Sequence, residues 1–201
     1  MTDDNFFSDD EISLLFNKEI FYTKRSATEK LYLLFSEIIA VIKDTPIHKS
    51  FLFPDGTDFS TGKISKGENY KGSPYVMLDF PKLFSKDSIF AFRAMFWFGH
   101  GFVFSIVVAG NALKPLQKKF LKNKNGLHHH NIYFSIFNHA WQHEIHKDAN
   151  ILVEEISTQE MEHHINKNHF IKLSSTSLEV QKEKLKNDVL KNYELMLGSF
   201  L

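Results

Sequence analysis

The sequence predicts an α+β fold, a mainly antiparallel sheet of about four or more strands with N- and C-terminal helices packed on one face. Apolar residues recur at helical spacing near both ends of the chain, and the middle alternates with the period of two that is typical of strands. Helices on either side of a run of antiparallel strands make an α+β domain. We expect one domain over residues 1–201, helical over about 8–45, a sheet over about 70–140, and helical again over about 157–198.

Helix starts are marked by capping motifs, in which a Ser or Thr oxygen and a Glu three residues later satisfy each other's backbone amides. The four motifs are Ser8-x-x-Glu11, Ser26-x-x-Glu29, Ser157-x-x-Glu160 and Thr176-x-x-Glu179. The first precedes an apolar stripe (Ile12, Leu15, Phe16 and Ile20). The second predicts a buried helix that begins after Ser26 and ends before Pro46. The fourth predicts a last helix from Ser177, with Leu178 facing inward.

Strands are expected at about 74–80, 89–98, 102–109 and 131–137. Residues 89–110 are apolar enough to span a bilayer as one helix, but Gly99-His100-Gly101 interrupts them. Their aromatic and β-branched residues favour two buried strands joined by a tight turn.

The other parts of the centre are polar. Residues 52–74 contain four glycines and two prolines, which predicts a long loop with room for a short strand. A run of lysines near 114–124 predicts a helix between the last two expected strands.

Alternation along these strands predicts two different faces of the sheet. One is wholly apolar (Phe90, Phe92, Ala94, Phe96 and Phe98), and we expect the helices to cover it. The other mixes aromatic and polar groups (Arg93, Trp97, Ser105, Tyr133 and Ser135).

The mixed face has the composition of a ligand pocket, with mostly apolar walls and a few polar groups. The candidate binding residues are Tyr70, Asp79, Arg93, Trp97 and His100, followed by Tyr75 and Tyr133. The alternative is structural, with Arg93 paired to Asp79 on a neighbouring strand and the face solvated or covered by the long loop. His100, between two glycines, also fits a simple turn residue.

Histidine clusters raise the question of a metal site. The candidate ligands are His139, His143, His146, His163 and His164, and the first three fall on one side if that segment is helical. The run His143-Glu144-Ile145-His146 lacks the spacing of an HExxH motif. Exposed or core-packed histidines are therefore the alternative, and no cofactor is expected.

Composition narrows the function classes. Lys+Arg and Asp+Glu both number 24, and only Arg25 and Arg93 are arginines, which argues against nucleic acid as a partner. Zero cysteines exclude disulfides and thiolate chemistry. The acidic start has no signal-peptide pattern, so we expect a soluble cytoplasmic protein that is not in a membrane. No phosphate-binding glycine motif or nucleophile elbow occurs, which leaves the question of catalysis open.

One block resembles a known family. Asn69-Tyr70-Lys71-Gly72-x-Pro74-Tyr75-x-Met77-Leu78-Asp79-Phe80-Pro81-x-x-Phe84 and Phe90-x-x-Arg93-x-Met95-Phe96-Trp97-x-Gly99 are similar to a family of uncharacterised hypothetical proteins of the Bacteroidetes. The resemblance covers the central half to two thirds of the chain and implies no activity or cofactor.

The leading functional hypothesis is a soluble domain that binds a small molecule or a partner through the mixed sheet face. The alternative is a metal-dependent, hydrolytic enzyme that uses two or three of the candidate histidines. A third hypothesis is a protein-interaction module in which the excess aromatic residues form an interface with a partner or, in a homo-oligomer, with another copy of this chain.

Overall fold

The computed structural model describes residues 6–201 and confirms the α+β class. The helices are α1 (Asp9–Phe16), α2 (Lys18–Asp44), α3 (Pro46–Ser50), α4 (Leu113–Asn123), α5 (Thr158–Asn168) and α6 (Lys182–Gly198), with a 3₁₀ turn at Lys124–Leu127. The strands are β1 (Lys63–Tyr70), β2 (Ser73–Phe84), β3 (Ser88–Trp97), β4 (Gly101–Gly110), β5 (Tyr133–Ser135), β6 (Asn150–Leu152) and β7 (Phe170–Ser177). They form one antiparallel sheet in the order β1-β2-β3-β4-β7-β5-β6.

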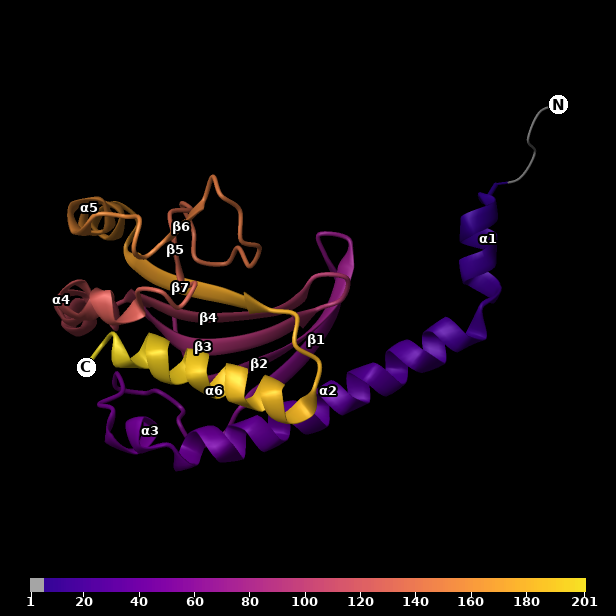
Figure 1. Cartoon of the computed structure of the whole chain (residues 1–201), viewed down its shortest axis with the longest axis horizontal. Coiled ribbons are helices and arrows are strands. Elements are labelled where there is room, and N and C mark those ends of the chain that lie inside the picture. Colours follow the sequence, from indigo (N-terminus) through magenta and orange to yellow (C-terminus); the bar gives the residue numbers. More distant parts are fainter. Residues whose placement is uncertain (1–5) are drawn as a thin grey trace.

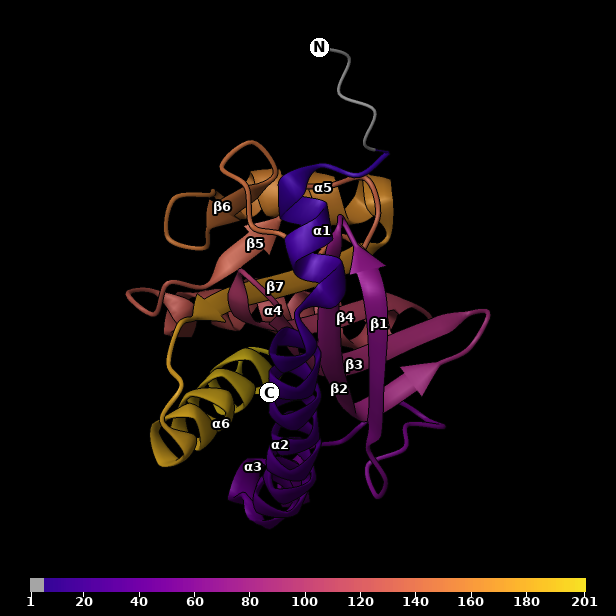
Figure 2. The ribbon, with the colours of Figure 1, turned by 90° about the vertical axis from the view of Figure 1, so that its right-hand side faces the viewer.

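The two faces of the sheet are covered differently. Figure 1 shows α2, α3 and α6 beneath the sheet, while β5 and β6, at one edge of the sheet, and the loop between them lie above β7 in this view. At the surface of the lower layer, the Glu37 carboxylate of α2 pairs with both Lys182 and Lys186 of α6 at 2.6 Å. The N-terminal helices extend past the sheet, and Figure 2 shows α1 and α2 projecting toward the viewer.

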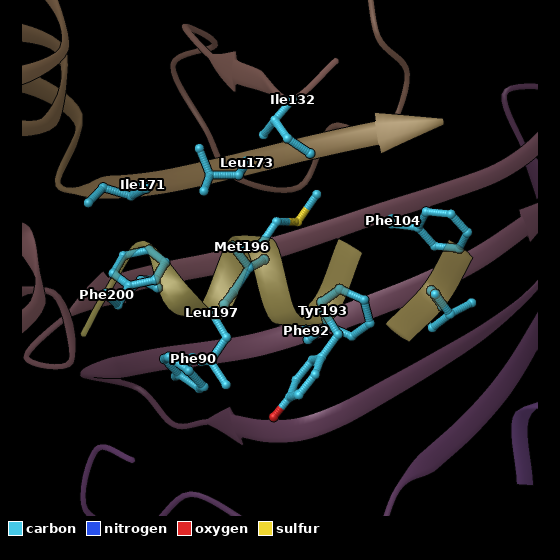
Figure 3. Close-up of a cluster of buried hydrophobic side chains, with 14 of the residues drawn as sticks. Phe90, Phe92, Phe104, Ile132, Ile171, Leu173, Tyr193, Met196, Leu197 and Phe200 are labelled. Atoms are coloured by element: carbon cyan, nitrogen blue, oxygen red, sulfur yellow. The ribbon is translucent and has the colours of Figure 1, made fainter. Parts of the chain in front are cut away.

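The hydrophobic core lies between the lower helices and the expected apolar face. Figure 3 shows Tyr193, Met196 and Leu197 of α6 against Phe90, Phe92 and Phe104 of the sheet. The Phe92 and Tyr193 rings pack edge to face, with centroids 5.1 Å apart. Burial of this many large apolar side chains is the main free-energy source for the fold.

The β-hairpin predicted for residues 89–110 is confirmed. β3 and β4 pair from Ser88–Gly110 to Trp97–Gly101, and Gly99 in the turn and Gly101 at the start of β4 both have positive φ. A Cβ on Gly101 would lie 2.9 Å from the Ser177 carbonyl oxygen, so glycine is required there. Among residues 6–201, no helix is long and apolar enough to cross a membrane.

The N-terminal helix prediction was right about its end and wrong about its start. α2 ends at Asp44, before Pro46, but it begins at Lys18 with the Asn17 side chain accepting from the Ile20 amide. Ser26 therefore lies inside the helix and caps nothing, because no residue between Lys18 and Asp44 breaks the helical pattern. The motif at Ser8 does form a capping box on α1.

The C-terminal prediction missed a strand. Ser157 forms the expected capping box on α5, but Thr176 belongs to β7, opposite Val103 of β4, and caps no helix. The last helix begins at Lys182 instead of Ser177, and Leu178 is exposed, not inward. Cross-strand pairing with the apolar β4 outweighed the local helix-start signal.

The sheet also extends beyond the expected residues 70–140. β1 uses the end of the expected loop, and β6 and β7 follow residue 140. The strand expected at 131–137 is shortened to β5, three residues long. The lysine-rich helix is confirmed as α4.

Candidate functional site

The mixed face of the sheet contains a buried ion pair between neighbouring strands. Arg93 of β3 lies opposite Asp79 of β2 in the register. Its Nε donates to Oδ1 of Asp79 at 2.7 Å, and its Nη2 donates to Oδ2 at 3.1 Å. Both side chains are buried, and the two-point geometry fixes the guanidinium plane. The contact between Arg93 and Asp79 that the structural alternative predicted is therefore confirmed.

The cover of this face is not the long loop before β2. It is the segment between β5 and β6, residues 136–149, which we name the cover loop. This segment forms neither helix nor strand, so the condition under which His139, His143 and His146 would share one side, a helix, is not met. The loop places His143 against the ion pair and Trp141 over the guanidinium, 5.8 Å from the ring centroid to Cζ.

His143 is held neutral in one tautomer. Nη1 of Arg93 lies 3.1 Å from Nε2 of His143, and because arginine can only donate, Nε2 accepts. Nδ1 then carries the proton, and this buried N–H has no acceptor within residues 6–201. Burial, with Lys172 and Arg93 nearby, lowers the pKa of His143 to about 2.

Lys172 of β7 is a second buried cation beneath the cover loop. Its ammonium donates to the carbonyl oxygens of Ala140, at 3.1 Å, and of Gln142. These bonds use two of its three protons. Burial and the nearby Arg93 lower the pKa of Lys172 to about 7. We name Asp79, Arg93, His143 and Lys172 the Arg93 cluster.

Two serine hydroxyls on the same face add to the unmet hydrogen bonds. Ser105 lies opposite Arg93 in the β3–β4 register, and Ser135 lies on the face that Tyr133 shares by strand alternation. Both Oγ atoms are buried without a partner in the described part of the chain. Buried polar groups are nearly always paired, so several unpaired ones on one face indicate a site.

The remaining candidate residues form a second group beside the cluster. Tyr70 donates its hydroxyl proton to Oε2 of Glu144 at 2.6 Å and accepts the His143 backbone N–H at 2.9 Å. Nε1 of Trp97 donates to the Tyr70 carbonyl at 3.2 Å. His100 stacks on Trp97 at 3.6 Å between centroids, as a turn residue packed on its own hairpin.

His143 connects these two groups, because it bonds to Arg93 and lies 5.3 Å from the Tyr70 ring. All five predicted binding residues thus belong to one continuous region. Of the two further candidates, Tyr75 packs edge to face on Tyr70, while Tyr133 lies in the β5–β7 register opposite Ser174.

Sequence reasoning missed the parts that the cover loop and β7 contribute. Lys172 carried no signal, because its strand was not predicted. His143 was noticed only as a candidate metal ligand, and Glu144 as its neighbour in the run from His143 to His146. Their contacts with Arg93 and Tyr70 span 50 and 74 residues, which no local pattern reports.

The five candidate metal ligands lie in separate places. His139 and His146 flank Phe137, His143 is in the Arg93 cluster, and His164 packs between Phe134 and Phe170. His163 is exposed on α5. Within residues 6–201, no group of three or more His, Asp or Glu side chains is placed to hold a metal ion.

The fold and site define an α+β protein with a buried, donor-rich polar cluster under a loop. Comparisons with protein-family models, with curated proteins and with solved structures found no match to this chain. The resemblance to the Bacteroidetes family therefore stays a prediction.

Proposed function

We propose that this chain is a binding domain for a small oxyanion, of the carboxylate or phosphate class, taken up between the sheet and the cover loop. The observation that carries the proposal is the excess of buried hydrogen-bond donors in and beside the Arg93 cluster. Asp79 is the cluster's only acid, against Arg93 and Lys172. The N–H at Nδ1 of His143 has no acceptor in the described residues, and neither the Ser105 nor the Ser135 hydroxyl has a partner there.

The chemistry of these groups selects the ligand. Donors without acceptors are satisfied by a molecule that brings oxygens, and an anion also balances the second buried cation. The hydroxyls of Ser105 and Ser135 can donate to the same oxygens. The aromatic rings of Trp141 and Trp97 supply the apolar walls that small-molecule sites usually have.

In this proposal the cover loop occupies the site when no ligand is bound. The carbonyl oxygens of Ala140 and Gln142 take the place of anionic oxygens on Lys172. A carboxylate that displaces them exchanges a neutral acceptor for a charged one, which makes a stronger bond. In this proposal the chain acts as a soluble cytoplasmic protein.

The test is thermal unfolding of the untagged protein with acetate, succinate, citrate or phosphate, against chloride at equal ionic strength. A ligand that binds only the folded state raises the melting temperature with its concentration. We expect at least one oxyanion to do so, and Lys172→Met to abolish the increase. Lys167→Met, on the exposed side of α5, is the matched control and should keep it.

Weak specific binding has a Kd of about 1 mM, so each oxyanion is added up to about 100 times that concentration. The proposal fails if none of them raises the melting temperature. It also fails if Lys172→Met responds as the unmodified protein does. Native mass spectrometry of the untagged protein is the companion measurement, because a retained acid of defined mass would identify the ligand directly.

A further inference from the structure

The N-terminal arm, residues 6–23, leaves the body of the protein with its apolar side chains uncovered. Figures 1 and 2 show α1 and the start of α2 extending away from the sheet. α1 has no buried residue, and the first buried residue of α2 is Leu34. The arm's exposed large apolar residues are Phe6, Phe7, Leu14, Leu15, Phe16, Ile20, Phe21 and Tyr22.

This apolar surface is larger than a monomeric protein usually exposes. With large side chains exposing up to about 150–250 Å² each, the arm presents on the order of 900 Å². A stable interface takes about 800 Å² from each partner. An isolated eight-residue helix such as α1 is also marginal in water, so a surface that packs against it would stabilise it.

An apolar groove lies on the same molecule, between α2 and α6. It has a volume of about 400 Å³ and apolar walls that include Leu31, Leu34, Phe96, Phe102 and Leu185. Val180, which is largely exposed, lies at its edge. We name it the α2–α6 groove.

The charges of the arm and the groove are complementary. The first turn of α1 contains Asp9, Asp10 and Glu11, and its last turn has no basic residue. The groove is rimmed by Lys30 and Lys182, and Lys30 has no ion-pair partner within residues 6–201. The acid of the groove, Glu37, is already paired with Lys182 and Lys186.

A chain cannot cover most of its arm with its own groove. Ile20, Phe21 and Tyr22 belong to α2, which runs unbroken from Lys18 to Asp44. Phe16 adjoins the bend at Asn17, so at 1.5 Å per residue it lies about 16 Å along the axis from Ala27, where the groove begins. A rotation at Asn17 could bring only the first residues of the arm back to the groove, and Phe16, Ile20, Phe21 and Tyr22 would stay uncovered. A second molecule is therefore needed to cover the whole apolar surface of the arm.

We propose that the chain forms a two-fold homodimer in which the arm of each copy binds in the α2–α6 groove of the other. The exchange is reciprocal, so both arms and both grooves are covered and the assembly closes. The proposal concerns the opposite side of the sheet from the Arg93 cluster and does not depend on the proposed oxyanion binding.

Sedimentation velocity of the untagged full chain at micromolar concentrations tests this dimer. We expect a dimer for the unmodified chain and a monomer for both Phe16→Glu in the arm and Val180→Glu at the groove. The dimer Kd should rise at least about 100-fold in each variant. Leu52→Glu, at an equally exposed position between α3 and β1, is the matched control and should remain dimeric. Because Phe16 and Val180 are exposed, circular dichroism should show each variant folded.

Two outcomes would overturn the proposal. The first is a monomeric unmodified chain over the whole concentration range. The second is a dimer that Phe16→Glu breaks but Val180→Glu leaves intact, because the arms would then pack on each other.

Cross-linking gives a second, independent readout, since the chain has no cysteine of its own. Phe16→Cys and Val180→Cys chains are mixed and treated with a flexible bis-maleimide. A cross-link between the two different variants is expected. Cross-links only between two Phe16→Cys chains, or no cross-links at all, would contradict the proposed binding of the arm in the α2–α6 groove.

Discussion

The two faces of the sheet are held by different forces, although they share the same strands. The lower face meets α2 and α6 through side chains such as Phe92 and Phe104 that are fully buried and make no directional bond. The upper face meets the cover loop through Arg93, Lys172 and Tyr70, each of which donates to or accepts from a loop atom.

Because of this difference, the lower face mainly determines stability, and the upper face mainly determines specificity. Apolar burial is roughly proportional to area and tolerates any well-filled packing. A buried polar contact depends on the position and protonation of each group. The lower face should therefore respond mainly to side-chain volume, apart from the buried His48, whose Nδ1 lies 2.7 Å from the Tyr193 hydroxyl. The upper face should respond to charge and pH.

The largest expected effect is loss of volume on the lower face. Phe104→Ala removes a fully buried ring from the centre of the core and should lower the free energy of unfolding by about 3–5 kcal/mol. Urea unfolding measures the change, which should be the same at pH 6 and pH 8. Leu52→Ala, at an exposed position, should change it by less than about 0.5 kcal/mol. A loss below about 1 kcal/mol for Phe104→Ala would contradict this account of the core.

The next effect is loss of charge pairing on the upper face. Arg93→Met leaves the Asp79 carboxylate buried without its partner and should cost about 3 kcal/mol. The double variant Asp79→Leu with Arg93→Met should recover most of that loss, since no unpaired charge remains. Lys49→Met, which breaks the exposed pair with Asp44, should cost less than about 1 kcal/mol. Equal losses in the single and double variants would show that the ion pair itself is not the cause.

The lower and upper faces of the sheet also differ in how well they could be predicted from the sequence. The alternation of Phe90, Phe92 and Ala94 correctly assigned the lower face, because a strand's period of two places apolar residues on one side. The hairpin at Gly99 and Gly101 was predicted for a similarly local reason. The pairing of Arg93 with Asp79 was foreseen as an alternative, because both strands were recognised.

What the sequence could not predict depends on long-range contacts. The cover loop has no periodicity, so His143 and Glu144 could not be placed over Arg93 and Tyr70. β7 was missed because its polar segment, with three serines, alternates too weakly to outweigh the helix-start motif at Thr176. Without β7, Lys172 could not be recognised as the second buried cation.

A smaller effect is the pH dependence that His143 introduces. Its pKa is about 2 in the folded state and about 6.5 when unfolded, so the unfolded chain binds one more proton between these values. Stability due to this group is therefore present above pH 6.5 and is lost as the pH falls toward 2. The slope is at most ~1.4 kcal/mol per pH unit, or about 2 kcal/mol between pH 6.5 and 5.

His143→Gln keeps an acceptor for Arg93 but cannot titrate. Urea unfolding at pH 6.5 and pH 5 should show about 2 kcal/mol less acid destabilisation in this variant than in the unmodified protein. His130→Gln, at an exposed position, should leave the difference unchanged. An equal pH dependence in all three proteins would mean that His143 is not held neutral against Arg93.

The smallest effect concerns one hydrogen-bonded hydroxyl that holds the cover loop. Tyr70→Phe removes the bond to Glu144 and the acceptor of the His143 N–H, and should cost about 1 kcal/mol in urea unfolding. Tyr133→Phe is the matched control on the same face, because its hydroxyl has no hydrogen bond within residues 6–201, and should cost less than about 0.5 kcal/mol.

Hydrogen exchange distinguishes a local effect of Tyr70→Phe from a global one. If Tyr70 holds the loop, the His143 amide should exchange faster in Tyr70→Phe while the amides of β3 and β4 keep their rates. Faster exchange in the strands as well would mean that Tyr70 stabilises the whole sheet. The cover loop would then open only with the rest of the fold, and the Arg93 cluster would be closed to any ligand from solution.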